Sequence, residues 1–147
     1  MAANRLAVAL SPHFDVSANT MLAAFLAPDM RRLYVDWDAM TAKAVAFLRS
    51  VIVGRDDDPA ITTLVGELST SSDRFRTLWA KHDVQVRDHG VTSFQHPGVG
   101  RLDLRYQKFV LPEAGHLLVT YHAEPGGASH DSLHRLADMP GRRTGDR

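Results

Sequence analysis

The spacing of hydrophobic residues changes once along the chain, near Asp83, and this change constrains the fold more than any other feature. Before Asp83, apolar side chains recur every three or four residues, as they do on the buried face of a helix. After it they alternate with polar residues, as they do in a strand with one buried face. Helices first and antiparallel strands second predict an α+β domain.

Capping residues mark where the helices should begin. Asn19, Asp36, Asp58 and either Ser71 or Ser72 precede helical segments, and side chains of these types accept hydrogen bonds from free N–H groups in a first helical turn. The expected helices span residues 2–10, 20–27, 28–34, 36–53, 59–69 and about 72–82. In the longest of them the expected buried stripe is Trp37, Met40, Thr41, Ala44, Phe47, Leu48 and Val51.

The second part of the chain predicts a sheet of three to four antiparallel strands. Val84 and Val86 and then residues 91–94 alternate about a turn at residues 88–90, which predicts a hairpin there. The next two strands are expected at residues 102–107 and 117–123. The strands are followed by a short helix to Met139, for which Ser129 is the expected N-cap.

The composition excludes several classes of protein. The chain has 147 residues, 17 basic and 17 acidic side chains, and no cysteine. Disulfides, thiolate metal sites and a cysteine nucleophile are therefore excluded, and zero net charge argues against broad binding to nucleic acid or to a membrane surface. No apolar run is long enough to span a membrane. We expect one soluble, cytoplasmic domain over residues 1–139, followed by a frayed tail over residues 140–147.

The histidines offer weak candidates for chemistry. His130 and His134 lie four residues apart, as in some zinc sites, but the metalloprotease pattern and a third ligand are lacking. His82 and Asp83 next to the serines of 69–72 could belong to a hydrolase, yet no nucleophile elbow accompanies them. We favour structural roles for these residues, and for His96 a packed position in a turn. No enzyme activity, metal or cofactor is predicted.

The aromatic residues allow two interpretations. They are Tyr34, Trp37, Phe47, Phe75, Trp79, Phe94, Tyr106 and Tyr121. Large rings usually form the core of a domain, so a filled core is the simpler interpretation. Several of them could instead line an apolar cavity that also offers a few hydroxyl or indole donors, as small-molecule pockets do.

Six segments, taken in order, resemble one known family. They are FLAP at 25–28, RLYVDW at 32–37, LWAKHDV at 78–84, FQHPGVG at 94–100, LDLRY at 102–106 and YHAEPG at 121–126. Together they resemble the ligand-binding domain of MmyB-like transcription regulators, which are common in actinobacteria. The resemblance covers roughly residues 3–138. Each segment alone is weak, but their order and spacing are specific.

The resemblance implies a PAS-like sensor domain, in which helices pack on an antiparallel sheet around a small apolar or fatty-acid-like ligand. It implies no catalytic residues. On this interpretation the expected ligand-binding residues are Tyr34, Trp37, Phe47, Trp79, Phe94, Tyr106 and Tyr121.

The chain also departs from the family pattern. In the family an XRE-type helix-turn-helix domain and one or two strands come first, whereas this sequence starts almost at the first helix. We therefore expect the opening strands to be missing and DNA to be bound only indirectly, through a helix-turn-helix domain absent from this chain. The strand at 117–123 would then have an unpaired edge, and a homodimer through that edge is possible. The alternatives are a protein-interaction or dimerisation module with a filled core, and a truncated remnant.

Overall fold

The structure is a computed structural model that describes residues 3–140 except 16–18, 56, 84 and 113–115. The chain divides into two compact units. The helical unit comprises residues 19–87, and the sheet unit comprises residues 1–18 and 88–147.

Five helices form the helical unit. They are α2 (Thr20–Leu26), α3 (Pro28–Leu33), α4 (Trp37–Ile52), α5 (Pro59–Ser71) and α6 (Asp73–Ala80). The predicted caps are confirmed, since the side chains of Asn19, Asp36, Asp58 and Ser72 each accept a hydrogen bond from an N–H group in the first turn that follows. Local cap chemistry therefore determines where these helices begin.

The core of the helical unit centres on Phe75, which is fully buried. Its ring meets the edge of the Phe25 ring at a centroid distance of 5.3 Å and stacks on Trp79 at 5.4 Å. The buried stripe of α4 differs in part from the predicted one, because Val45 and Ala46 are buried while Val51 is 37 % exposed. The buried stripe is rotated about the helix axis relative to the predicted one, because α4 packs against both α2 and α6.

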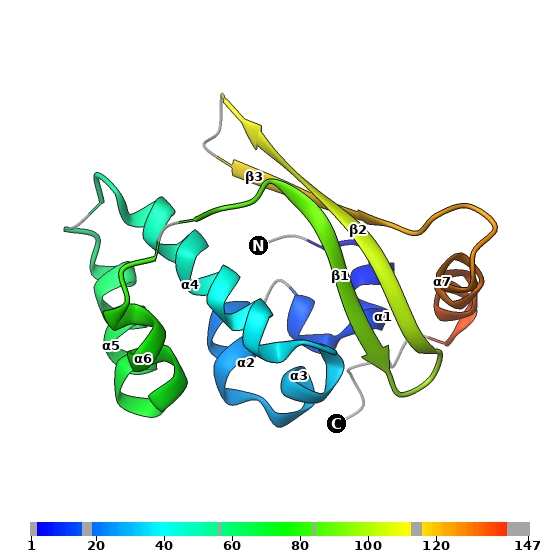
Figure 1. The fold of residues 1–147 in the computed structure, drawn as a ribbon, viewed down its shortest axis with the longest axis horizontal. Helices are drawn as coiled ribbons and strands as arrows, with labels where there is room; N and C mark the ends of the chain where they lie inside the picture. The colour runs from blue at the N-terminus through cyan, green and yellow to red at the C-terminus, as the bar shows by residue number, and fades with distance from the viewer. Residues whose placement is uncertain (1–2, 16–18, 56, 84, 113–115, 141–147) are drawn as a thin grey trace, which may run out of the picture. The chain divides into compact units, whose positions relative to one another are not determined.

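The sheet unit contains three antiparallel strands in the order β1-β2-β3 (Figure 1). They are β1 (His89–His96), β2 (Gly100–Leu111) and β3 (His116–His122). The helix α1 (Arg5–Leu10), a 3-10 turn (Pro12–Phe14) and the helix α7 (Ala128–Asp138) complete the unit, with α7 beside β2. Helices and a three-stranded antiparallel sheet confirm the α+β prediction. In the described part of the chain no strand precedes β1.

The predicted hairpin about residues 88–90 is wrong. Residues 85–88 form no strand, and Val84 lies outside the described residues. β1 instead pairs with β2 across the turn that follows His96, with Phe94 opposite Leu102. This pairing is favoured because β2 has 12 residues, which is long enough for all eight residues of β1 to pair with it.

The helix α7 begins one residue before the predicted cap. Its N-cap is Gly127, and Ser129 lies inside the first turn. The Ser129 hydroxyl accepts a hydrogen bond of 2.9 Å from the backbone N–H of Asp103, so it joins α7 to β2 rather than capping its own helix. Of the predicted tail, residues 141–147 lie outside the described residues.

His96 has the packed role that the sequence predicted, and only 8 % of it is exposed. Its Nδ1 accepts a hydrogen bond of 3.0 Å from the Gly98 N–H, so Nε2 carries the proton and donates to the Ala9 carbonyl at 3.1 Å. One neutral imidazole therefore joins α1 to the end of β1.

Candidate functional site

The strand register brings three of the predicted ligand-binding residues together on one face of the sheet. Tyr106 on β2 lies opposite Tyr121 on β3. The Tyr121 ring is 6.3 Å from the Tyr106 ring and 6.0 Å from the Phe94 ring on β1, between centroids. Because side chains in a strand alternate between faces, these rings share the face that carries Leu102 and Leu104.

This face runs from the core to the surface, and most of its side chains are apolar or aromatic. Phe94 is fully buried and Tyr106 is 6 % exposed, whereas Tyr121 is 45 % exposed. Beyond Tyr121 the same face carries further exposed apolar side chains, and we call this set the apolar patch. The apolar patch consists of Tyr121, Val119, Leu117 and Val110. Contiguous apolar surface of this kind typically marks a place where a ligand or a partner binds.

The tyrosines give the apolar patch a small polar component. Burial raises the pKa of the Tyr121 phenol and the nearby Tyr106 phenol raises it further, although much of the residue is still accessible. The Tyr106 ring lies against Gly90, where an added Cβ would be 3.0 Å from its Cε1 and from its hydroxyl oxygen. Gly90 therefore makes room for the ring, and the ring in turn contacts Tyr121.

One cationic side chain lies among the side chains of the apolar patch. Lys108 lies between Tyr106 and Val110 on β2, opposite Val119 on the same face, and its ammonium group is 5.9 Å from the centroid of the Tyr106 ring. A cation over the π face of an aromatic ring is attracted by the ring quadrupole. The face therefore combines apolar side chains with one positive charge among them.

The opposite face of the sheet is polar near its middle. The Ser93 hydroxyl donates a hydrogen bond of 2.5 Å to the Asp103 carboxylate, and Arg101 pairs with the same carboxylate at 3.1 Å. The Ser93 hydrogen bond lowers the pKa of Asp103 most; burial opposes it, and Arg101 adds to the lowering. The charges are confined to this part of the face, since Phe109 and Leu118 further along it are exposed apolar side chains.

The two tryptophans of the predicted site serve the packing of the helical unit. Trp37 donates a hydrogen bond of 2.8 Å from Nε1 to the Ala24 carbonyl, which ties α4 to α2. The Arg49 guanidinium lies 3.9 Å from the centroid of the Trp79 ring and also donates to the Trp79 carbonyl, which ties α4 to α6.

The other two predicted residues of this unit, Tyr34 and Phe47, are half-buried. The structure thus divides the predicted set into four residues in the helical unit and three in the sheet unit.

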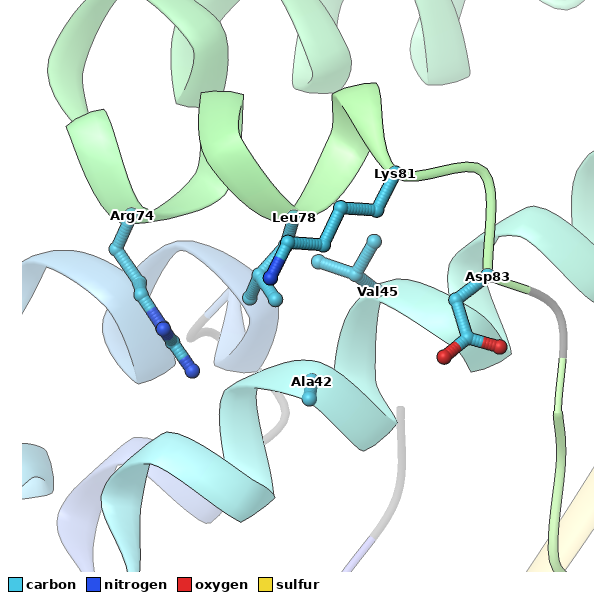
Figure 2. A pocket seen from close by; sticks show the side chains of 6 residues that line it. All are labelled: Ala42, Val45, Arg74, Leu78, Lys81 and Asp83. Atoms are coloured by element: carbon cyan, nitrogen blue, oxygen red, sulfur yellow. The ribbon is translucent and has the colours of Figure 1, made fainter.

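A pocket of about 200 Å³ lies between α4 and α6 (Figure 2). It is lined by Ala42, Val45, Arg74, Leu78, Lys81 and Asp83. None of the seven predicted residues is among them. The sequence signal that could have found it is the spacing of Arg74, Leu78 and Lys81, which places them on one face of α6.

Two of the charged groups of this pocket, those of Arg74 and Asp83, have protein partners. Arg74 donates from Nε to the Thr41 hydroxyl at 3.2 Å and from Nη2 to the Asp38 carbonyl at 2.9 Å. Asp83 accepts a hydrogen bond of 3.2 Å from the Gln85 N–H. Figure 2 shows Arg74 and Lys81 extending from one helix, so the lining is mixed and largely polar at its ends.

The other three histidines considered as candidates from the sequence have local contacts. His82 has a left-handed backbone (φ 54°), and its Nδ1 lies 2.9 Å from the Ala80 carbonyl, which agrees with a structural position at the end of α6. His130 and His134 face each other with 3.3 Å between their Nε2 atoms. Within the described residues, no three side chains of the metal-ligating types gather at one point.

Comparison with known protein families identifies the chain. Residues 1–136 match the family described as MmyB-like transcription regulator ligand binding domain. The chain belongs to this family. The match confirms the resemblance seen in the sequence, and no curated protein matches the chain.

Family membership indicates the general role of this domain. An MmyB-like ligand-binding domain is part of a transcription regulator and takes a small-molecule ligand, and the family is not a class of enzymes. None of the described helices is both long enough and apolar enough to cross a membrane. The sequence placed Leu117, Val119 and Tyr121 in one alternating strand, but it did not single out Lys108, because only the pairing of β2 with β3 shows that Lys108 shares their face.

Proposed function

We propose that this MmyB-like domain is a non-enzymatic, cytoplasmic sensor whose ligand is a small apolar, fatty-acid-like molecule seated on the apolar patch. The observation that carries the proposal is the continuity of one sheet face, from the buried Phe94 through Tyr106 to the half-exposed Tyr121 and Val119. A hydrocarbon chain laid along this face would cover side chains that water now contacts. Lys108, which lies opposite Val119 within the patch, suits an acidic head group.

The size and polarity of the α4–α6 pocket argue against it as the site for such a ligand. Its volume is about 200 Å³, below the roughly 300–1,000 Å³ of ordinary small-molecule pockets. An apolar chain placed there would also meet Arg74 and Asp83, whose polar groups are held by protein partners. Burying those groups against hydrocarbon would cost free energy without new hydrogen bonds.

The hydrophobic effect predicts how affinity should depend on the ligand. Each buried methylene contributes about 0.8 kcal/mol, which corresponds to roughly a fourfold change in affinity. Affinity should therefore rise steeply with chain length until the chain is longer than the apolar patch. An acid should bind more tightly than the alcohol of equal length, because only the acid offers a negative charge to Lys108.

Sensing requires more than binding. A ligand shifts a protein between two states only by the difference of its affinities for them. We propose that the liganded sheet face favours one arrangement of the regulator and thereby biases a helix-turn-helix domain that binds the DNA. In this scheme DNA is a partner only indirectly.

The test is calorimetric titration with saturated fatty acids of increasing length and with the matching alcohols. We expect Tyr121→Ser to weaken binding of acids and alcohols alike, and Lys108→Met to weaken only the acids. Leu118→Ser is the matched control, because Leu118 is 48 % exposed on the same strand but on the opposite face. Equal losses in Tyr121→Ser and Leu118→Ser, or no binding by any member of the series, would refute the proposal.

A further inference from the structure

The outer edge of β3 is the most accessible backbone edge of the sheet. β3 pairs with β2 on one side, and among the described residues no strand pairs with its other side. All seven residues of β3 are exposed, whereas β1, the strand at the other edge, is partly buried along much of its length. Every second residue of an edge strand directs an unpaired N–H and C=O outward, so this edge can accept another strand.

The composition of β3 does nothing to prevent such pairing. Natural edge strands are commonly protected by lysine, by proline or by a bulge. The sequence of β3, HLLVTYH, contains no proline and no acidic or basic residue other than its terminal histidines, His116 and His122. Its exposed side chains are apolar on both faces, with Leu118 on one face and Leu117 and Val119 on the other.

We propose that β3 pairs with β3 of a second copy of this chain, antiparallel and about a two-fold axis through Val119. The symmetry restricts the register. A two-fold axis perpendicular to the sheet keeps each face on its own side, so only residues of the same face can lie opposite each other. Val119 is the middle of the seven residues, and centring the axis there is the one register that pairs all of them.

The resulting contacts are self-complementary. Val119 lies opposite its own copy, and Leu117 lies opposite Tyr121. On the other face, Leu118 lies opposite Thr120 and His116 opposite His122. No pair of like formal charges meets at neutral pH, and apolar cross-strand pairs of this kind stabilise antiparallel sheets. The two sheets become one six-stranded sheet, and a second copy is the one partner certain to offer this complementary edge.

The first test is the mass of the protein in solution as a function of concentration, measured by light scattering after size exclusion. We expect a dimer that dissociates on dilution. Val119→Lys should give a monomer, because it places two ammonium groups opposite each other at the axis. Val91→Lys is the matched control, since Val91 is 51 % exposed on β1, away from the interface, and this variant should remain a dimer. Circular dichroism checks that both variants are folded.

The second test measures the register directly. Because the chain contains no cysteine, an introduced cysteine is the sole site at which a maleimide can react with a thiol. In Val119→Cys the two thiols lie across one strand pair, so a short bifunctional maleimide should join the copies efficiently. In Val91→Cys the thiols lie five strand spacings apart, which is about 24 Å across the sheet, and they are further displaced along the strand direction, so they should not be joined. A wild-type monomer at high concentration, a dimer that persists in Val119→Lys, or equal cross-linking of the two cysteine variants would each overturn the proposal.

Discussion

The contact between Gly90 and Tyr106 gives the sharpest prediction about the sheet face. A Cβ at Gly90 would lie 3.0 Å from Cε1, 3.0 Å from the hydroxyl oxygen and 3.1 Å from Cζ of Tyr106. Comfortable carbon contacts are about 3.5–4.0 Å, so Gly90→Ala forces the ring to move. Overpacking of this kind costs about 1–3 kcal/mol, and the reduced backbone freedom of alanine returns about 0.5–1 kcal/mol. The expected net loss in the free energy of unfolding is about 0.5–2 kcal/mol.

The assay is urea denaturation followed by far-ultraviolet circular dichroism, with Gly66→Ala as the control. Nothing lies within 4 Å of a Cβ built at Gly66, which is inside α5, so alanine there should stabilise the protein by about 0.5–1 kcal/mol. The two substitutions therefore have opposite expected signs. Because the Tyr106 ring contacts Tyr121, Gly90→Ala should also weaken binding at the apolar patch, whereas Gly66→Ala should not. A Gly90→Ala protein as stable as Gly66→Ala would refute the packing argument.

Three further predictions concern single side chains. Trp37→Phe leaves the Ala24 carbonyl without its indole donor and should cost about 1 kcal/mol in urea denaturation followed by the fluorescence of Trp79. The lowered pKa of Asp103 contributes stability that is fully present above its unfolded pKa of about 3.9 and is lost as pH falls through the folded pKa. The thermal midpoints of wild type and Asp103→Asn should therefore differ at pH 7 and converge progressively as the pH is lowered below about 3.9. The raised pKa of Tyr121 contributes stability that is fully present below its unfolded pKa of about 10 and is lost as pH rises through the folded pKa. In a titration followed by phenolate absorbance, one tyrosine should therefore ionise later than the others, and this late ionisation should be absent in Tyr121→Phe. Thermal midpoints of wild type and Asp103→Asn that still differ in acid would contradict the prediction for Asp103. A late-ionising tyrosine that is still seen in Tyr121→Phe would contradict the prediction for Tyr121.

The helix starts were predictable because their causes are local. Asn19, Asp36 and Ser72 each bond to N–H groups two or three residues further along, and those bonds depend on residue type and spacing alone. The burial of Val45 and Ala46 was not predictable in the same way. It depends on which helices flank α4, and a single helical stripe in the sequence does not give that information.

The strand pairing could not be predicted from local sequence alone. Both residues 88–90 and residues 97–100 contain turn-forming residues, and the sequence did not distinguish which turn joins two strands. The outcome depends on β2, whose length lets it pair with β1 over the full length of that strand. Ser129 is a similar case, because its hydroxyl was expected to bond within its own helix and instead bonds to Asp103 on β2.

The candidate site was predictable in residue type but not in its grouping. Seven aromatic residues were predicted as one site, yet Trp37 and Trp79 hold helices together while Tyr106 and Tyr121 share a sheet face. Which rings meet depends on register and on tertiary packing, and both are properties of the folded chain.

The central claim is that an apolar ligand binds the sheet face at Tyr121, and chemical-shift mapping tests it most directly. The measurement is a titration of isotopically labelled protein with a saturated fatty acid, followed through backbone amide and methyl resonances. The account predicts shifts concentrated at Tyr106, Lys108, Val119 and Tyr121. Shifts concentrated instead at the α4–α6 pocket, around Val45 and Leu78, would contradict it.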